Sequence, residues 1–322
     1  MLPILSKLLK KHICDHLCEF LEENGLLHRF QSGFRKFHST ETALIRLVDQ
    51  LLFDLDRNRT SGLVFIEYKK AFDLFGLLLE KLKAYGARDN DLNLLRSYLS
   101  GRTQHVHING CHSSPRTVSA EVPQGSILGP ILFLLFTNDL PSASQHSTVD
   151  IYADDTTVSL PSGVTNELTA MSSALQQDLD DVSRWSAANK MVTNSAKTKC
   201  PLVTGKCIPC KLENCSLELK LGDSDIEQVD SQKLLRVTID KQLSFDVHAK
   251  ELCKKLCQRV AVLRKIRRFI PIEQRILYYN AMITHVMLYG STVWSNCSAD
   301  NLTRIRKLQK RAGRGNLGAD TR

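Results

Sequence analysis

The chain has 322 residues, of which 43% are hydrophobic and 24% are charged. This balance is ordinary for a folded protein with a buried core, and it excludes a disordered chain. The net charge of +9 indicates a surface that prefers polyanions as partners.

The positive charge is concentrated in the C-terminal part of the chain. Residues 248–322 contain sixteen Lys and Arg residues against four acidic residues, a local net charge of +12, so the first 247 residues sum to −3. This distribution predicts a near-neutral body with a basic segment that binds nucleic acid, and a solvated basic helix is the competing interpretation.

The sequence gives no sign of export or membrane insertion. No apolar run reaches about 18 residues, and the N-terminal segment lacks a signal-peptide cleavage site. We therefore expect an intracellular protein, cytoplasmic or nuclear, whose ten cysteines are reduced thiols. The CxxC spacing of Cys207 and Cys210 is compatible with zinc, but loop cysteines are the favoured interpretation.

The predicted elements alternate between helices and short strands. Apolar periodicity and cap residues such as Thr40 and Thr42 predict helices over 3–25, 40–56, 76–86, 88–99, 126–138 and 166–190. Basic helices are expected over 246–269 and 302–314. Strands are expected over 63–66, in a hairpin over 103–121, and on both sides of an acidic turn between 149 and 160. This pattern predicts an α+β or α/β class.

The acidic turn is the sequence's first chemical signal. Asp154 and Asp155 are adjacent, and two carboxylates this close repel one another unless a divalent cation lies between them. An adjacent acidic pair alone is more often a solvated turn, so the argument depends on the neighbouring motifs.

Five short motifs occur in a recognisable order. They are QSGFR at 31–35 with HST at 38–40, FIEYKKAFD at 65–73, VPQGSILGP at 122–130, YADD at 152–155, and NKMV at 189–192 with KTK at 197–199. This order resembles the fingers motif and motifs A to D of the reverse transcriptase domain of non-LTR, LINE-like (jockey-type) retrotransposons. The resemblance runs over essentially the whole chain.

The resemblance implies an RNA-directed DNA polymerase that binds an RNA template, a DNA primer and deoxynucleotides. Two Mg²⁺ ions, or Mn²⁺, would be held by Asp154, Asp155 and Glu67, which occupies the position of the motif A aspartate. Lys197 resembles the motif D lysine that is proposed to protonate pyrophosphate, with an ordinary solvated lysine as its alternative. The resemblance also implies an α+β right-hand fold: a palm with an antiparallel sheet packed on helices, helical fingers and a partial helical thumb.

The resemblance assigns further residues to substrate binding. Arg35 matches a fingers arginine that clamps the triphosphate, and Phe72 matches the side chain that excludes a 2′-hydroxyl, with core packing as its alternative. Gln124 and Gly125 match a loop along the incoming base pair. Residues 1–240 would form the fingers and palm, and residues 241–322 a truncated basic thumb. Its nucleic-acid contacts are predicted at Lys254, Lys255, Arg259, Arg264, Lys265, Arg267 and Arg268.

Three departures from the family pattern predict impaired activity in this copy. Glu67 is one methylene longer than the expected aspartate, and the segment after Asp73 is about two residues short. Arg236 stands where a hairpin glycine is expected. The alternative function is therefore a catalytically inactive relic that acts at most as a nucleic-acid-binding protein. A metal-dependent phosphodiesterase is disfavoured because no histidine cluster accompanies the acidic residues. Oligomeric state is not predicted.

Overall fold

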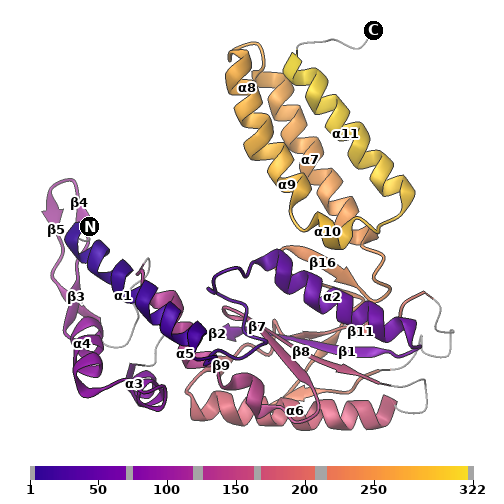
Figure 1. Cartoon of the computed structure of the whole chain (residues 1–322). Helices are drawn as coiled ribbons and strands as arrows, with labels where there is room; N and C mark the ends of the chain where they lie inside the picture. Colours follow the sequence, from indigo (N-terminus) through magenta and orange to yellow (C-terminus); the bar gives the residue numbers. More distant parts are fainter. Residues whose placement is uncertain (1–3, 70–74, 119–125, 163–167, 207–215, 318–322) are drawn as a thin grey trace.

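A computed structural model describes residues 4–69, 75–118, 126–162, 168–206 and 216–317. Figure 1 shows a base formed by a sheet and its covering helices, from which two parts rise. One is an arm that contains the N-terminal helix, and the other is a C-terminal helical bundle. The mixture of helices and sheet agrees with the expected class.

The base is organised around a sheet with strand order β14-β10-β1-β8-β7, and β11 also pairs with β1. Only the β10–β14 pair among these is parallel; the other pairs are antiparallel. These strands are β1 Ser61–Ile66, β7 Thr148–Tyr152, β8 Asp155–Pro161, β10 Lys199–Cys200, β11 Leu202–Val203 and β14 Glu227–Gln228.

Strand β1 lies at the centre of this sheet and is buried along its whole length. Successive side chains of a strand point to opposite faces. Accordingly, Val64 and Ile66 pack into one hydrophobic cluster, and Leu63 and Phe65 pack into the other. This explains why the sequence reads as a continuous apolar run rather than an alternating one.

Helices cover both faces of the sheet, with α2 on one side and α6 on the other (Figure 1). Helix α2 spans Thr40–Asp56, as expected, but its cap differs from the prediction. The N-cap is Ser39, whose Oγ accepts the amide of Thr42, and the Thr42 hydroxyl accepts the amide of Ser39 in return. The reciprocal pair satisfies two helix-end donors. The remaining covering elements are α5 Gly129–Thr137, the 3₁₀ helix η1 Leu140–Ala143 and α6 Leu168–Ala188.

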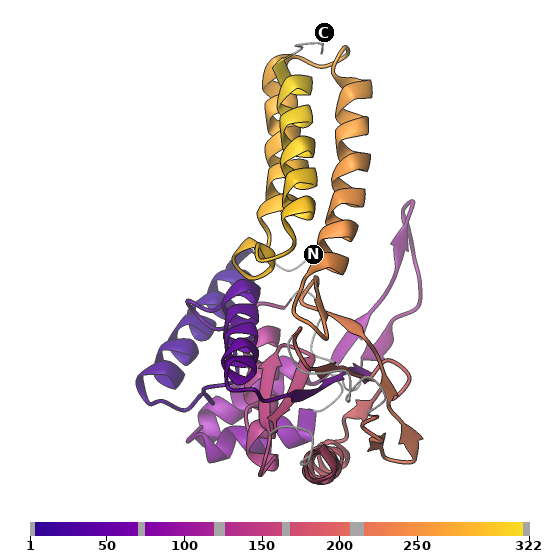
Figure 2. The same ribbon diagram turned by 90° about the vertical axis from the view of Figure 1, so that its right-hand side faces the viewer.

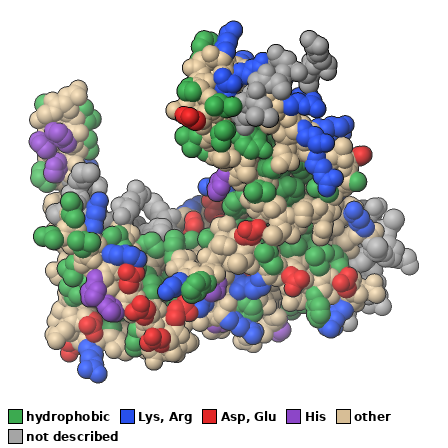
Figure 3. Space-filling view, turned by 45° about the horizontal axis from the view of Figure 1, so that its top comes forward, with side chains coloured by type: hydrophobic (Ala, Val, Ile, Leu, Met, Phe, Trp, Pro, Cys, Tyr) green, Lys and Arg blue, Asp and Glu red, His purple; other side chains and the backbone are tan. Residues whose placement is uncertain are grey.

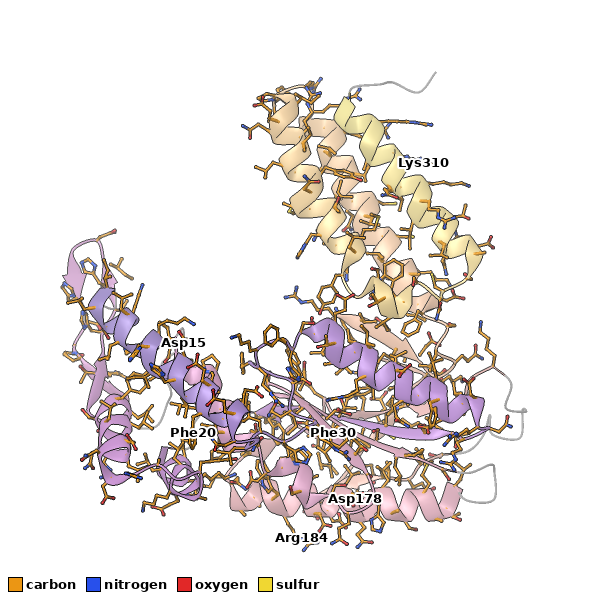
Figure 4. All side chains as sticks on the ribbon, in the orientation of Figure 1. Asp15, Phe20, Phe30, Asp178, Arg184 and Lys310 are labelled. Carbon is orange, nitrogen blue, oxygen red and sulfur yellow. The ribbon has the colours of Figure 1, made fainter. Side chains whose placement is uncertain are left out.

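Helix α6 also fixes the loop that leads into β7. Asp178, labelled in Figure 4, is fully buried on α6 and accepts the amides of Gln145, His146 and Ser147. Burial opposes ionisation of this carboxyl, but the hydrogen bonds outweigh it and leave the pKa of Asp178 below its ordinary value. The charged side chain therefore anchors the chain immediately before β7.

The arm combines the N-terminal helix with a helical pair and a protruding hairpin (Figures 1 and 2). The expected hairpin is present, with Arg102 paired with Val118 and His107 paired with His112. The arm's elements are α1 Ile4–Glu23, α3 Phe75–Ala84, α4 Asp89–Leu99, β3 Arg102–Gln104, β4 His107–Ile108, β5 Cys111–His112 and β6 Arg116–Val118.

Three further pairs of short strands complete the fold, and the last of them leads into the bundle. They are β2 Tyr68–Lys69 with β9 Val192–Thr193, β12 Lys220–Leu221 with β13 Ser224–Asp225, and β15 Ser231–Leu234 with β16 Val237–Asp240. Each is too short to show periodicity in the sequence. The β15–β16 pair is the hairpin in which the resemblance expects a glycine at residue 236, and the other two pairs were not predicted.

The bundle contains the two expected basic helices and a third helical stretch that was not predicted. Its elements are α7 Asp246–Ile266, α8 Ile272–Tyr278, the π-helical turn η4 Tyr279–Thr284, α9 His285–Leu288, α10 Ser291–Trp294 and α11 Ala299–Leu317. Leu252, Leu256, Val260 and Leu263 of α7 are buried, as the sequence pattern indicated.

Contacts near Tyr289 attach the bundle to the base. The Tyr289 hydroxyl donates to the carbonyl of Leu235 over 2.8 Å, and the Trp294 indole donates to the carbonyl of Tyr289 over 2.8 Å. Gly290 lies against Val237, so close that an added Cβ would meet Val237 Cγ2 at 3.0 Å. These contacts place Tyr289, Gly290 and Trp294 at the junction between the bundle and the base.

The turn between β15 and β16 has the backbone conformation that makes Arg236 unfavourable. Leu235 and Arg236 both have positive φ, +44° and +69°, as in hairpin turns that favour glycine.

We expect Arg236→Gly to stabilise the protein by about 1 kcal/mol, because glycine has no Cβ to strain. Urea denaturation of the variant measures this. Arg236→Ala is the matched control, since alanine keeps the Cβ, and an equal gain from alanine would contradict the backbone argument.

Among the described residues, no helix is both long enough and apolar enough to cross a bilayer.

Candidate active site

The acidic turn is a tight connection between two paired strands. Tyr152 pairs with Asp155, so Ala153 and Asp154 alone form the loop between β7 and β8. Ala153 has a φ of +57°, in the left-handed region. Asp154 and Asp155 are both exposed, and they lie at the end of the sheet where β7 ends and β8 begins.

The antiparallel register brings Glu67 to the same end of the sheet. Ile66 is the last residue of β1, and it pairs with Thr156, the residue after Asp155. Glu67 follows directly, and its carbonyl accepts the amide of Asn194 over 2.7 Å. Residues more than eighty positions apart in the sequence thus become neighbours at one strand end.

The pKa of Asp155 is raised to about 6 in the folded protein. Removal from water is the largest cause, followed by the negative charges of Asp154 and Glu67. Like charges held together disfavour ionisation, so the charged form of Asp155 destabilises the folded state at neutral pH.

The Glu67 carboxylate is engaged by Lys197. The Lys197 Nζ donates to Glu67 Oε1 over 2.5 Å, and the two side chains are 63% and 42% exposed. Lys197 reaches this position because β9 pairs with β2 immediately after Glu67. The two residues that the sequence assigns to different catalytic roles therefore contact each other.

The carboxylates of Glu67, Asp154 and Asp155 are neighbours, but they are not arranged around one common position. Across the part of the chain that the structure describes, no three His, Cys, Asp or Glu side chains are arranged to hold a metal ion. The donor chemistry suits Mg²⁺, which prefers carboxylate oxygens, and the raised pKa of Asp155 reflects a local excess of negative charge that a cation would offset. The Glu67 carboxylate is paired with Lys197 in this arrangement.

The raised pKa gives a pH-dependent prediction for the metal-free protein. The folded state binds the Asp155 proton more tightly than the unfolded state, so stability falls as the pH rises from about 4 to about 6. We expect Asp155→Asn to be more stable than wild type at pH 8 by on the order of 1 kcal/mol, after allowance for screening at this exposed position.

Urea denaturation in EDTA at pH 8 and at pH 4 measures this difference. The advantage of the variant is expected to vanish at pH 4, where the wild-type carboxyl is protonated in the folded state. An advantage of equal size at both pH values would argue against carboxylate repulsion.

Arg35 contacts helix α1, and its guanidinium is already hydrogen-bonded to other residues of the protein. Its Nε and Nη2 donate to the two carboxylate oxygens of Glu22 on α1, over 2.9 and 2.7 Å, and Nη1 donates to the carbonyls of His28 and Gln31. The residue lines a cavity of about 930 Å³ between α1 and the following loop. To bind a triphosphate as predicted, Arg35 would have to break at least some of these hydrogen bonds.

The remaining predicted site residues divide into two groups. Phe72, Gln124 and Gly125 lie outside the described residues, as do Cys207 and Cys210. The seven basic residues predicted to contact nucleic acid all lie on or just after α7. Lys254, Lys255, Arg264, Lys265 and Arg268 are exposed, whereas Arg259 and Arg267 are partly buried.

Arg259 is bonded within the bundle. Its Nη1 donates to the carbonyl of Met282 in the π-helical turn, and its own carbonyl accepts the Tyr278 hydroxyl over 3.2 Å. Figure 3 shows a hollow between the arm and the bundle. Many of the Lys and Arg side chains visible on the bundle gather on the side away from the arm, and hydrophobic side chains lie on the side toward it.

Comparisons with known proteins identify the class. The family model described as "Reverse transcriptase (RNA-dependent DNA polymerase)" matches residues 1–239. The chain therefore belongs to the reverse transcriptase family.

The similar proteins specify the branch of the family, as the motif order predicted. The chain is 31% identical over 98% of its length to the "Probable RNA-directed DNA polymerase from transposon BS" of Drosophila melanogaster. It is 29% identical over 99% of its length to the "RNA-directed DNA polymerase from mobile element jockey" of the same species. In both cases it spans 35% of the relative's length. These relatives are polymerases of non-LTR retrotransposons.

A solved structure supports the fold independently. The telomerase of Candida albicans, solved in complex with a TWJ fragment of telomeric RNA, matches 96% of this chain and 55% of its own chain. The TM-score is 0.52 at 10% identity. At this identity the similarity concerns the fold alone.

Proposed function

We propose that this chain is the polymerase domain of a non-LTR retrotransposon protein, which extends a DNA primer along an RNA template. The observation that carries the proposal is the meeting of Glu67, Asp154 and Asp155 at one end of the sheet, in a chain of the reverse transcriptase family. The reaction joins the primer 3′ hydroxyl to the α-phosphate of a deoxynucleotide and releases pyrophosphate.

Asp154, Asp155 and Glu67 would hold the two Mg²⁺ ions, with Mn²⁺ as a substitute. The ions supply activation of the hydroxyl and neutralisation of the departing pyrophosphate. The protein's own contribution is to place three carboxylates together on rigid strand ends, despite their mutual repulsion. Lys197 lies within reach of the site and would donate a proton to pyrophosphate, but only after it leaves Glu67.

The substrate side of the site would be formed by the arm and the adjacent loops. We assign the triphosphate to Arg35, the sugar to Phe72, and the nascent base pair to Gln124 and Gly125, on the resemblance alone. Arg35 would have to exchange Glu22 for phosphate oxygens, which offer the same bidentate geometry.

The parts of the molecule suggest a right-hand arrangement. The sheet with α5 and α6 would be the palm, the arm the fingers, and the bundle the thumb. We propose the division at residues 240 and 241. It is supported by the end of the family match at residue 239 and the end of β16 at Asp240. RNA and primer would lie in the hollow between arm and bundle (Figure 3).

Primer extension on an RNA template tests the proposal. Wild-type protein should incorporate deoxynucleotides with Mg²⁺ or Mn²⁺, weakly because of Glu67, and Glu67→Asp should do so strongly. If neither protein incorporates more than the Asp154→Ala variant, the polymerase assignment fails for this chain.

The alternative function, an inactive relic that binds nucleic acid, is favoured by two contacts. Lys197 forms an ion pair with Glu67, and Glu22 forms an ion pair with Arg35, so both predicted site residues already have protein partners.

Whether the chain is an active polymerase or an inactive relic, the exposed lysines of α7 would contact phosphates. Lys254→Gln with Lys255→Gln should therefore lower the salt dependence of RNA binding. The slope of log affinity against log salt should fall by about 1.5. Fluorescence anisotropy measures it, with the exposed Lys220 and Lys241, changed together to Gln, as the matched control. Equal slopes of log affinity against log salt for the two double variants would refute a phosphate contact of Lys254 and Lys255.

A further inference from the structure

The loop Phe30–Gly33 extends the sheet at the edge next to the acidic turn. Strand β7 is the last strand of the sheet, and its outer edge pairs with this loop. The Ile151 amide donates to the Phe30 carbonyl, and the Ser32 amide donates to the Ile151 carbonyl, each over 2.9 Å. The contact is a parallel bridge between Gln31 and Ile151. The loop therefore holds β7 two residues before the turn begins.

Gly33 lies against the backbone of the turn itself. A Cβ added to this glycine would be 2.4 Å from the amide nitrogen of Ala153, 3.1 Å from its Cα and 3.3 Å from the carbonyl carbon of Tyr152. A Cβ separation of 2.4 Å essentially never occurs in real structures, so only glycine allows the two backbones to approach this closely. The next residues of the turn are Asp154 and Asp155.

The side chain of Gln31 fixes the loop from within. It is 1% exposed, its Oε1 accepts the Gly33 amide over 3.1 Å, and its Nε2 donates to the Thr137 hydroxyl over 3.1 Å. Thr137 is itself buried at the end of α5. Both polar ends of the buried amide are satisfied, which gives a stiff link between α5 and Gly33.

Arg46 of α2 fixes the loop from the opposite side. Its guanidinium donates to the carbonyl of Arg29 over 2.9 Å and pairs with Asp150 in β7. It also lies over the ring of Phe30, with Cζ 5.3 Å from the centroid. Phe30, labelled in Figure 4, lies near the end of the sheet, below α2 in that view. The loop is therefore held between two helices and the strand that leads to the carboxylates.

We infer that Gly33 and Gln31 are positioning residues that set the location of Asp154 and Asp155. Gly33 allows the Ala153 backbone to lie directly against the loop, and Gln31 holds Gly33 in place. The inference rests on the proposed function, because its consequence is the placement of carboxylates that bind divalent cations. It concerns residues to which the motif resemblance assigns no role.

The test compares Gly33→Ala with Gly313→Ala. Gly313 is a suitable control because an added Cβ there would meet nothing within 4 Å. In Gly33→Ala the turn must move by several tenths of an ångström or more. We expect the dissociation constant for Mn²⁺, measured by electron paramagnetic resonance of the free ion, to rise at least tenfold. The kcat for incorporation should fall by about a hundredfold with KM for template–primer unchanged. Gln31→Met should shift both quantities in the same direction by less.

A second measurement uses the unmodified protein, so that it does not depend on the variant folding. Binding at the turn and order in the loop are coupled reciprocally. Mn²⁺ should therefore slow hydrogen exchange at the Ser32 and Gly33 amides as well as at the turn. Protection of the turn with no change at Ser32 and Gly33 would overturn the inference.

The outcomes separate the inference from the function on which it rests. If wild type binds Mn²⁺ and Gly33→Ala binds it equally well with equal kcat, the positioning role is wrong and the proposed function stands. If neither wild type nor Glu67→Asp binds Mn²⁺ at the acidic turn, the proposed function fails and the inference fails with it.

Discussion

Glu67→Asp should raise the rate of deoxynucleotide incorporation by about a hundredfold over wild type. The glutamate side chain is one methylene longer than aspartate, and its carboxylate is bonded to Lys197 rather than directed at a point shared with Asp155. Mg²⁺ requires near-ideal octahedral geometry at about 2.0–2.1 Å from oxygen. Shortening the side chain weakens the contact with Lys197 and returns the carboxylate toward the strand end.

Single-turnover primer extension on an RNA template measures this gain. Lys197→Gln is the informative comparison, because it frees Glu67 without shortening it. We expect it to recover less activity than Glu67→Asp, since the carboxylate stays displaced and the proposed proton donor to pyrophosphate is lost. Glu67→Gln, which removes the negative charge, should show no gain. A Glu67→Asp rate equal to that of wild type would mean that residue 67 does not limit this copy.

Asp154→Asn should lower incorporation by about a thousandfold or more in the Glu67→Asp background. Removing a metal-binding carboxylate costs several kcal/mol in the transition state, and each 1.36 kcal/mol is a factor of ten in rate. The substitution is nearly isosteric and the residue is exposed, so the fold should persist.

Asp223→Asn is the matched control for this loss. Asp223 is also an exposed aspartate in the two-residue turn of a hairpin, between β12 and β13, and it lies outside the site. Its replacement should leave incorporation unchanged. Equal losses from Asp154→Asn and Asp223→Asn would show that a general change of surface charge is being measured.

Much of the fold could be predicted from local sequence pattern. The expected helix over 40–56 and the strands on both sides of the acidic turn lie where the pattern placed them. These elements have long apolar stripes or strong turn signals, which depend only on neighbouring residues. The resemblance expects a hairpin glycine at residue 236, and the structure gives Arg236 a positive φ, the conformation that glycine adopts most easily.

The third helical stretch of the bundle could not be predicted in the same way. Residues 272–288 form α8, a π-helical turn and α9 in succession. A π-helical turn has a wider hydrogen-bonding spacing than the α-helix, so it interrupts the 3.6-residue period that identifies a helix in a sequence. The apolar residues on both sides therefore do not form one continuous stripe.

The candidate site shows the same division between local and distant contacts. The motif order predicted that Glu67 would meet the acidic turn, and the register of β1 with β8 brings them together. It did not predict that Lys197 would bond to Glu67, that Glu22 would bond to Arg35, or that Gly33 would support Ala153. These contacts depend on how the arm and the loop after β9 pack, which no local pattern records.

Anomalous diffraction from crystals soaked in Mn²⁺ tests the central claim most directly, because it locates bound cations without reference to activity. We predict a peak bonded to carboxylate oxygens of both Asp154 and Asp155, strengthened by Glu67→Asp and absent in Asp154→Asn. Ordered Mn²⁺ elsewhere in the same crystals, with none at the β7–β8 turn, would contradict the assignment of these carboxylates as the catalytic metal site.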